Sequence, residues 1–505
     1  MAEAKQTTFI RDLILTQATA ALTVAGLIVV TRLLAKGLGA ELFGVYALGR
    51  RVTMMAIPLA TVSAGVSITR YVAQAEDEWS RLRFLVAGLI LAVLPCALIA
   101  VVAAGLAPQV SAIVFGAAQY APVCRAWAVM LVGYALYTVS FSLYRGSGRI
   151  GTANLWQLGV VVLCPIVASA VLARRGEVAP IVFVMGAAYY AVLLPLGANM
   201  LRGFRSSREG LRVGSALAPL VRYGAPRIPG SFALYGLFVI GPLLAPHFLS
   251  LKESGYLVVG QSLLVIVEGG LSAFTVVLLP KVSRLVAEKR DEFIRERVGN
   301  LLAFVFHCGL FAMLHLALWS DQIVWGWVGS EYAPAVPVVR IFAVVTLPYA
   351  TFMMCRPVID AVEEKAVNTL NLLVSLVLAA VLCFVLSVAG AGLWGLAAGA
   401  AAGFWALGLK TFWYVRRRFR TGTGQFRIVW VLLLNAGCIA AGWAVKSGLE
   451  EQDSAWLLVC GAVVFECVLA GAYFLALRRL KVEWISELEK RLFPLRQSEQ
   501  ENSSQ

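Results

Sequence analysis

The sequence is poor in charged residues, which make up only 14% of its 505 positions, while 60% are hydrophobic. Soluble domains carry about a quarter charged residues, so an ordinary soluble fold is excluded. No Gly-Lys dipeptide occurs, which excludes a P-loop and ATP as the direct driver. The nine cysteines form no Cys-x-x-Cys pair, and the histidines His307 and His315, eight residues apart, lack ligand spacing. We therefore expect neither a metal site nor a bound cofactor.

Long apolar runs make up most of the sequence. A helix needs about 20 apolar residues to cross the hydrocarbon core of a bilayer. Fourteen runs meet that length: residues 12–35, 43–71, 84–106, 122–144, 152–173, 179–201, 218–247, 253–279, 299–319, 335–356, 367–388, 391–413, 427–446 and 455–477. The first run is too long for a cleavable signal peptide, and no suitable cleavage site follows it. The pattern predicts an all-α polytopic membrane protein with 14 transmembrane helices.

The net charge of +15 is unevenly distributed along the chain. With residue 1 in the cytoplasm, the cytoplasmic side receives the basic clusters at 202–222, 281–297, 416–427 and 478–496. The outside loops hold only Lys36, Arg174, Arg175, Lys252 and Lys446. This asymmetry follows the positive-inside rule and predicts that both termini are cytoplasmic. Basic loops of this kind also contact anionic lipids, so membrane lipids are expected partners and nucleic acid is not.

No loop is long enough to form a folded domain outside the membrane. The C-terminal segment 478–505 is a predicted cytoplasmic tail, in which Leu480, Trp484, Leu488 and Leu492 share one helical face. An amphipathic pattern of this kind predicts a short helix on the membrane surface. Its polar last residues are expected to be disordered.

Several motifs recur at an offset of 211 or 212 residues. Gly44-x4-Gly49 returns as Gly255-x4-Gly260, Arg70 as Lys281, Tyr120-Ala-Pro122 as Tyr332-Ala-Pro334, and Arg145 as Arg356. Six predicted helices lie between the copies, so both copies have the same orientation. The pattern predicts two parallel six-helix bundles, the architecture of a transporter with a cleft between its halves. We expect the repeated glycines to mark a turn and a helix entry.

The repeat divides the chain into four parts. Residues 1–215 form a first lobe with helices 1–6, and 216–420 form a second lobe with helices 7–12. Helices 13 and 14, in 421–477, have no counterpart in the repeat and are an addition at the edge. Residues 478–505 form the cytoplasmic tail.

Three arginines lie in or near the first two predicted helices. Arg32 is about one turn from the outer end of the first, and Arg50 and Arg51 are about 10 Å inside the second. A charge at the centre of a spanning helix costs about 2.5–3.5 kcal/mol, so such residues usually face the protein interior or a water-filled cavity. Successive helical residues diverge by about 100°, so Arg50 and Arg51 cannot both face one cavity. The alternative is that they extend to the headgroups or pair with Glu41.

The seventh predicted helix opens with GAPRIPG, residues 224–230. Pro226 and Pro229 each remove a backbone donor and should break or kink the helix there. Arg227 between them is either a cavity ligand or an anchor at the cytoplasmic edge. Arg356 is a further candidate because it matches Arg145 in the repeat, although helix-end residues of this type usually extend to the headgroups.

Glu268 is the main acidic candidate, near the middle of the eighth predicted helix and followed by two glycines. A carboxyl group at this depth could carry a coupling proton, bind Na⁺ or act as a counter-ion to cavity arginines. A structural salt bridge or hydrogen bond is an equally good interpretation. Glu466 is similarly placed in the last helix, where a transport role is less expected.

Several arginines and few acids predict a cationic cavity. Its natural ligand is an anionic, phosphate-bearing substrate, because guanidinium groups bind phosphate through two parallel hydrogen bonds. An exporter of organic cations would be expected to show the opposite charge balance.

The segments TRLLAKGLGAELFGVYAL, SAGVSITRYVAQ and LVRYGAPRIPG, together with the 14 spans, resemble the polysaccharide-transport and O-antigen flippases. These belong to the multidrug/oligosaccharidyl-lipid/polysaccharide exporter superfamily. The resemblance implies translocation of an undecaprenyl-diphosphate-linked oligosaccharide across a bacterial cytoplasmic membrane by alternating access. It also implies partnership with a polysaccharide polymerase and chain-length proteins, and products such as O-antigen, lipopolysaccharide or exopolysaccharide.

Related lipid II flippases carry cavity arginines in helices 1, 2 and 8. Arg32 and Arg50 match the first two positions. Helix 8 has Glu268 and no arginine, which favours a polysaccharide repeat unit over lipid II. The resemblance thus supports Arg32 and Arg50 as substrate-binding residues. The intramembrane charges and the repeat add Arg51, Arg227 and Arg356 to the predicted substrate site, with Glu268 as a coupling residue for H⁺ or Na⁺ or as a counter-ion.

Two other functions are compatible with the sequence. One is an exporter of drugs or small solutes from the same superfamily. The other is an enzyme, either a membrane polysaccharide polymerase or a glycosyltransferase. Such an enzyme needs catalytic acids or a sizeable loop, whereas the outside loops here are short and their acids show no paired arrangement. We therefore expect no catalytic residues.

Overall fold

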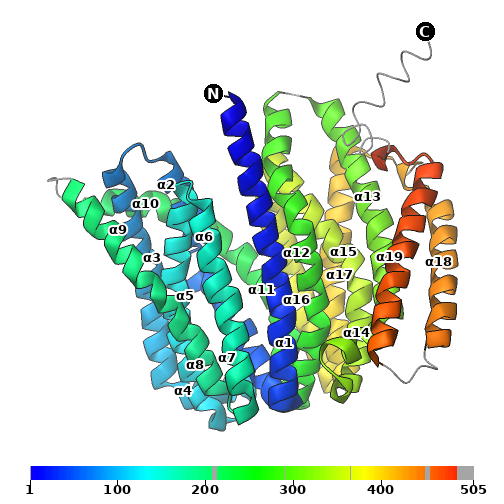
Figure 1. Cartoon of the computed structure of the whole chain (residues 1–505), viewed down its shortest axis with the longest axis horizontal. Coiled ribbons are helices and arrows are strands. Elements are labelled where there is room, and N and C mark those ends of the chain that lie inside the picture. The colour runs from blue at the N-terminus through cyan, green and yellow to red at the C-terminus, as the bar shows by residue number, and fades with distance from the viewer. Residues whose placement is uncertain are drawn as a thin grey trace. The chain divides into compact units, whose positions relative to one another are not determined.

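The computed structural model describes residues 2–206, 213–288, 290–363, 365–422, 424–449 and 455–485, and every regular element in these ranges is helical (Figure 1). The all-α prediction is therefore confirmed. The described chain packs as two compact units. Unit 1 comprises Met1–Ser272 and Leu372–Gly403, and unit 2 comprises Ala273–Asn371 and Phe404–Gln505.

The helices that begin in unit 1 are α1 (Ala2–Ala60), α2 (Ala64–Gln74), α3 (Glu78–Gly105), α4 (Ala107–Phe115), α5 (Ala121–Gly146), α6 (Ile150–Trp156), η2 (Gln157–Leu163), α7 (Cys164–Leu172), α8 (Val178–Tyr189), α9 (Leu193–Ser206), α10 (Gly214–Gly224), η5 (Ala225–Arg227), α11 (Ile228–Phe248), α12 (Leu251–Ala287) and α17 (Gly392–Phe419). Those that begin in unit 2 are α13 (Asp291–Leu318), α14 (Ser320–Trp327), α15 (Val336–Val362), α16 (Val367–Val388), α18 (Ile428–Leu449) and α19 (Ala455–Arg479). Short 3-10 turns also occur at η1 (Ala118–Tyr120), η3 (Ala173–Arg175), η4 (Tyr190–Val192), η6 (Ser330–Ala335) and η7 (Gly424–Phe426).

Thirteen helices of the described chain are long and apolar enough to cross a membrane. The first of them, Ile14–Ala60, contains 47 residues and covers the first two predicted spans. A straight helix of that length would extend about 70 Å, more than twice the bilayer core. It is interrupted at Gly39, where φ is 72° and ψ is 172°. Only glycine adopts this conformation readily, so α1 consists of two limbs, and the predicted spans are accounted for.

Gly44 lies five residues after the interruption at Gly39, and Gly255 is the fifth residue of α12. The predicted helix entry is therefore present at both positions, although both glycines lie inside helices and not in the turn itself. A Cβ on Gly44 would lie 1.9 Å from the carbonyl oxygen of Leu251 in α12. A Cβ on Gly255, its counterpart, would lie 3.1 Å from the carbonyl oxygen of Ala40 and 3.4 Å from the Cα of Gly44. The repeated positions therefore face each other and allow the α1 and α12 backbones to come into contact.

The break predicted at residues 224–230 is present. Helix α10 ends at Gly224, a 3-10 turn covers Ala225–Arg227, and α11 begins at Ile228. Pro226 and Pro229 supply no backbone N–H, which explains why the α-helical hydrogen-bond ladder is interrupted here.

A second break was not predicted and divides the expected span 43–71. Helix α1 ends at Ala60 and α2 begins at Ala64, with Val62 at φ 51° and Ser63 at φ 50°. A positive φ is unusual for a β-branched residue. A Cβ on Gly224 would lie 2.3 Å from the carbonyl oxygen of Val62. The two helix breaks therefore pack directly against each other within unit 1, and only glycine at position 224 permits this.

The expected span 152–173 is also irregular. Gln157–Leu163 forms a π-helical turn between α6 and α7. Pro165 follows it and lacks the N–H that would bond four residues back, which accounts for the local widening. Turns of this type re-aim side chains and often occur at functional sites.

The first unit is built around a tight group of helices. Figure 1 shows α3, α5 and α8 as neighbours, and the short α2 packs on α3 and α5. The core shared by α2, α3, α5 and α10 contains the fully or nearly buried side chains of Ile68, Leu85, Leu131, Val139 and Leu220. At the start of α3, Asp77 accepts hydrogen bonds from the Ser80 amide and hydroxyl, at 2.6 and 3.1 Å. These bonds lower the pKa of the Asp77 carboxyl and cap the helix.

In unit 2, α13 packs on α15, and α18 and α19 stand side by side next to α13 (Figure 1). The chain after α19 turns back onto this unit, with Val482 and Ile485 buried in its core. The Trp484 indole donates a 3.0 Å hydrogen bond to Nδ1 of His307. The first part of the predicted surface helix is thus packed against protein, while Leu488 and Leu492 lie outside the described residues.

Two predictions about organisation remain predictions. The lobes 1–215 and 216–420 were defined by the sequence repeat, whereas the two units are defined by compact packing. The units therefore do not test the lobes. The cytoplasmic location of both termini also stays a prediction, because it depends on charge distribution alone.

Candidate functional site

Unit 1 contains a cavity of about 880 Å³. Helices α2, α5, α8, α10, α11 and α12, both limbs of α1 and the π turn contribute to its wall. Thr23 and Pro58 both line it, although about 50 Å would separate them on a straight helix. The reversal at Gly39 therefore makes this cavity possible.

Three arginines, Arg50, Arg70 and Arg145, line the cavity. Arg50 projects from the second limb of α1 and acts electrostatically on the hydroxyls of Tyr134 and Tyr189. Arg70 lies 4.4 Å from the ring centroid of Tyr223, and Arg145 lies 5.5 Å from that of Phe141. The guanidinium groups of Arg70 and Arg145 thus rest near an aromatic ring, which holds them without neutralising their charge.

The wall of this cavity includes no aspartate and no glutamate. Within the described ranges, no carboxylate lies within ion-pair distance of Arg50, Arg70 or Arg145. Glu41, considered as a partner for Arg50, instead accepts a hydrogen bond from the Tyr120 hydroxyl at 3.2 Å. Three formal positive charges without a fixed counter-ion give the cavity wall a net positive charge.

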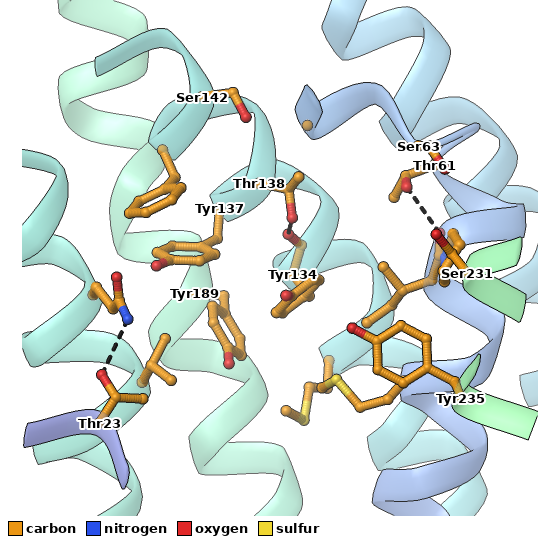
Figure 2. A pocket seen from close by; sticks show the side chains of 18 of the residues that line it. Thr23, Thr61, Ser63, Tyr134, Tyr137, Thr138, Ser142, Tyr189, Ser231 and Tyr235 are labelled. Carbon is orange, nitrogen blue, oxygen red and sulfur yellow. Dashed lines mark hydrogen bonds between the residues drawn. The ribbon is translucent and has the colours of Figure 1, made fainter. Parts of the chain in front are cut away.

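Aromatic rings form one side of the cavity. Tyr134, Tyr137 and Tyr189 pack with ring centroids 5.4–5.9 Å apart, and Phe141 stacks on Tyr137 at 5.6 Å. Figure 2 shows Tyr235 reaching from the α11 side toward this group. The aromatic rings provide apolar faces next to the guanidinium groups.

Hydroxyl and amide groups supply the remaining polar surface, including Thr61, Ser63, Thr138, Ser142 and Ser231 (Figure 2). Gln157 of the π turn donates a 3.0 Å hydrogen bond to the Thr23 hydroxyl. Neutral donors and acceptors of this type suit a ligand with many hydroxyl groups.

Of the residues predicted for a substrate site, Arg50 lines the cavity. Its neighbour Arg51 points elsewhere, with its guanidinium 4.9 Å from the ring centroid of Phe238 in α11. This agrees with the expected 100° divergence of successive helical residues. Arg32 is half-buried on the first limb of α1 and is not part of the cavity wall.

The other predicted residues also lie off the wall. Arg227 donates to the carbonyl oxygen of Tyr223 and covers the Tyr223 ring at 3.8 Å, so it supports a wall residue. Arg356 pairs with Asp360 at 3.8 Å within unit 2. Glu268 is half-buried on α12, three residues after the wall residue Val265, and the adjacent Gly269 packs on Val24.

Arg70 and Arg145 are wall residues that the sequence did not identify as site residues. Each closes a predicted helix, where arginine usually extends to the headgroups. The structure brings the ends of α2 and α5 together: a Cβ on Gly146 would lie 2.8 Å from the carbonyl oxygen of Thr69. The only sequence signal was their recurrence as Lys281 and Arg356.

Comparison with solved structures shows a shared fold. The "Lipid II flippase MurJ, inward closed conformation" is 12% identical, with a TM-score of 0.68, over 96% of this chain and 100% of that one. An inward-facing multidrug resistance MATE family transporter of the MOP superfamily is 16% identical, with a TM-score of 0.58, over 81% of this chain and 94% of that one. The Vibrio cholerae MATE transporter VcmN in its bent form is 16% identical, with a TM-score of 0.54, over 83% and 98%.

A search of curated proteins found no match. A family model described as "Polysaccharide biosynthesis protein" matches residues 13–286, which include the entire cavity wall. Because this match covers more than half of the sequence, the chain belongs to the polysaccharide biosynthesis protein family.

Proposed function

We propose that this protein is a flippase that moves an undecaprenyl-diphosphate-linked oligosaccharide across the bacterial cytoplasmic membrane by alternating access. The observation that carries the proposal is the cavity of about 880 Å³ with Arg50, Arg70 and Arg145 in its wall and no carboxylate. Family membership and the shared fold with a lipid II flippase support it.

The diphosphate is the group that fits the arginines. Guanidinium groups bind phosphate oxygens through paired, charge-assisted hydrogen bonds. Arg145 lies in the last turn of α5, and Arg70 lies four residues before the end of α2, at the ends predicted to face the cytoplasm, so they would meet the diphosphate first. Arg50 lies among the tyrosines and would hold it further along the cavity.

The glycan fits the rest of the wall. Sugar rings present apolar C–H faces that pack on aromatic rings, and their hydroxyls pair with neutral polar side chains. Tyr235 is 39% exposed and lies across from the Tyr134, Tyr137 and Tyr189 group (Figure 2). A cavity of 300–1,000 Å³ encloses a ligand of about drug size, which corresponds to a diphosphate with a short oligosaccharide.

The paired helix breaks offer a means of movement. The Thr61–Ser63 break and the Ala225–Arg227 turn lie beside the cavity and contact each other through Val62 and Gly224. Helix interruptions of this type serve as hinges or line binding sites in transporters. We propose that rotation at this contact accompanies closure around the substrate.

The remaining predicted residues keep secondary roles in the proposal. Arg32 and Arg51 lie on the two limbs of α1 but off the cavity wall, and Arg227 supports the wall residue Tyr223. Arg356, in unit 2, stays a predicted substrate residue. Glu268, near the cavity residue Val265, is proposed to respond to H⁺ or Na⁺ or to act as a counter-ion.

The test is transport by single-arginine variants. In a strain whose surface polysaccharide depends on this protein, Arg50→Ala is expected to reduce surface polysaccharide by at least about tenfold, the effect of losing roughly 1.4 kcal/mol of substrate stabilisation. Lipid-linked repeat units should accumulate, and immunoblotting should show unchanged protein. Arg51→Ala is the matched control, because it removes the neighbouring charge outside the cavity, and it should retain most activity.

Full activity of Arg50→Ala would contradict the proposed anion site. Equal losses in Arg50→Ala and Arg51→Ala would point to a general requirement for charge in this helix. Arg32→Ala tests the resemblance against the cavity geometry. The resemblance places Arg32 in the substrate site, whereas the cavity wall does not include it. Export of cationic dyes that is independent of Arg50 would instead support a drug exporter.

A further inference from the structure

One stretch of the cavity wall in unit 1 is apolar except for a single amide and a single hydroxyl. It is formed by the first limb of α1 and by the segment that runs from the π turn into α7. The polar wall residues of these two segments are Thr23 and Gln157. Their other wall residues are Val24, Leu27, Val30, Val161 and Pro165. A Cβ on Gly26 would lie 2.6 Å from Cγ1 of Val162, so the two segments pack closely and form one continuous wall.

The hydrogen bonds of Thr23 fix which way the Gln157 amide points. The Thr23 hydroxyl donates its one hydrogen to the carbonyl oxygen of Thr19 at 2.8 Å. It can therefore only accept from Gln157, whose amide group lies 3.0 Å away, and the dashed line at Thr23 in Figure 2 is this bond. The atom of Gln157 that faces Thr23 is consequently the donor Nε2, and Oε1 lies on the other side of the amide.

Oε1 of Gln157 is an acceptor that the protein itself does not use. Among the residues that the structure describes, none donates a hydrogen bond to it. Gln157 is half-buried and lines the cavity, so this oxygen is available to a ligand. An acceptor held in one orientation selects a ligand group that donates a hydrogen bond.

The π turn places Gln157 in this wall. Gln157 is its first residue, and the Cys164 amide at its end donates to the carbonyl oxygen of Gly159, five residues back. In an unbroken α-helix, positions 157 and 165 would point about 80° apart, since each residue adds about 100°. A π turn contains more residues per turn than an α turn and reduces this angle. The turn therefore keeps Gln157 on the same face as Val161 and Pro165, which line the cavity with it.

The surroundings of Gln157 determine which donor fits best. Val24 and Val161 are half-buried wall residues, so apolar surface borders the acceptor. A sugar hydroxyl donates a hydrogen bond but has no apolar part. An acetamido group combines an N–H donor with a methyl group, and moving a methyl-sized group from water onto apolar surface favours binding about fourfold.

We propose that Gln157 is a specificity-determining residue that selects a glycan carrying an acetamido group. Its Oε1 accepts the hydrogen bond of the acetamido N–H, while the methyl group packs against Val24 and Val161. Thr23 is a positioning residue, because it holds the Gln157 amide in the orientation that presents Oε1. This assignment rests on the proposed function, since it takes the ligand to be a lipid-linked oligosaccharide.

The test compares two ligands that differ in the group that Gln157 contacts. Each is a farnesyl diphosphate, one carrying a disaccharide of N-acetylglucosamine and the other the matching disaccharide of glucose. Both sugars are changed, so the position of the acetamido group along the glycan need not be known. In equilibrium binding with radiolabelled ligands, full-length wild-type protein in detergent should bind the acetamido ligand at least about fourfold more tightly, the contribution of the methyl group alone.

Two variants test the roles of the amide and of the hydroxyl. Gln157→Leu keeps the size of the side chain and removes the acceptor. The acetamido N–H then has no partner, whereas a sugar hydroxyl rotates toward another, so the ratio of the two affinities should fall at least about threefold. Binding of the glucose ligand should stay within about twofold of the wild type, which shows that the variant is folded. Thr23→Val releases the amide and should lower the same ratio by a smaller factor.

Arg50→Ala separates this assignment from the proposed function. It removes a charge that serves the diphosphate of both ligands, so it should weaken both about tenfold and leave their ratio unchanged. Unweakened binding of both ligands to Arg50→Ala would contradict the anion site, while the ratio in Gln157→Leu would still test the acetamido site.

Three results would overturn the assignment of Gln157. They are equal affinities of the wild type for the two ligands, tighter binding of the glucose ligand, and a ratio that Gln157→Leu does not change. If Gln157→Leu does not fold, the wild-type ratio and Thr23→Val decide the matter.

Discussion

The two glycine-containing stretches, Gly44–Gly49 in α1 and Gly255–Gly260 in α12, occupy matching positions in the sequence repeat. The residues that follow them differ in charge and in surroundings. Gly44 and Gly255 face each other and bring the two backbones together. The next repeat positions diverge: Arg50 lines the cavity, whereas Gln261 is fully buried. The comparison teaches that both copies keep the glycines of the backbone contact, while the position that follows them is positively charged in one copy only.

The difference has an energetic basis. An arginine in a spanning helix is tolerated where it faces water or an anion, which the cavity permits at position 50. The side chain of Gln261 is enclosed, and neither its oxygen nor its nitrogen has a hydrogen-bond partner among the described residues. An amide can remain there at moderate cost, but a guanidinium cannot.

Exchanging the two side chains should have the largest effect. The double variant Arg50→Gln with Gln261→Arg keeps the composition but buries a charge without a partner, at about 3–5 kcal/mol. We expect loss of both transport and thermal stability, measured by surface polysaccharide and by unfolding in detergent. Arg50→Gln alone should lose transport and keep its stability. An active double variant would show that the two positions are equivalent.

Adding a methyl group to the shared contact should have the next largest effect. In Gly44→Ala the new Cβ would lie 1.9 Å from the Leu251 carbonyl oxygen, so the helices must separate. A loss of about 3 kcal/mol is expected from overpacking. Gly197→Ala in α9 is the matched control, because its Cβ meets no atom within 4 Å, and it should stabilise the helix slightly. Equal melting temperatures for the two variants would show that the close contact between Gly44 and Leu251 does not limit the stability of the protein.

The smallest effect is expected at the reversal between the limbs of α1. Gly39→Ala meets no neighbouring atom, so its cost comes only from the backbone, at φ 72° and ψ 172°. About 1–3 kcal/mol is typical of that conformation. Thermal unfolding should show a loss no larger than that of Gly44→Ala, and unchanged stability would mean that the limbs can rearrange.

Much of the fold could be predicted from local chemistry. Pro226 and Pro229 predict the break after Gly224, because proline removes a backbone donor wherever it occurs. The break at Thr61–Ser63 carries no comparable signal, since Val62 adopts its positive φ where its carbonyl meets Gly224 of a distant helix. A contact 162 residues away in sequence cannot be inferred from local propensity.

The candidate site, like the fold, could be predicted only in part from the sequence. Intramembrane arginines indicated an anion site, and helical geometry indicated that Arg50 and Arg51 diverge, but periodicity could not say which one faces the cavity. Arg70 and Arg145 looked like headgroup anchors because each closes a helix, and only the packing of α2 against α5 brings them to the wall. The two buried histidines were passed over because their spacing suits no metal, although each has a partner on another segment.

Apolar run length and the scarcity of charge were enough to establish a helical membrane protein, because the thickness of a bilayer dictates how many residues a helix needs. The motifs were enough to indicate the polysaccharide family to which the chain belongs. Tertiary structure alone decided which charges share one cavity, because that depends on the reversal at Gly39, on the meeting of Gly44 with Gly255 and on the two joined helix breaks. Those contacts join residues far apart in sequence, and their close approach requires glycine at a few positions whose partners no local pattern specifies.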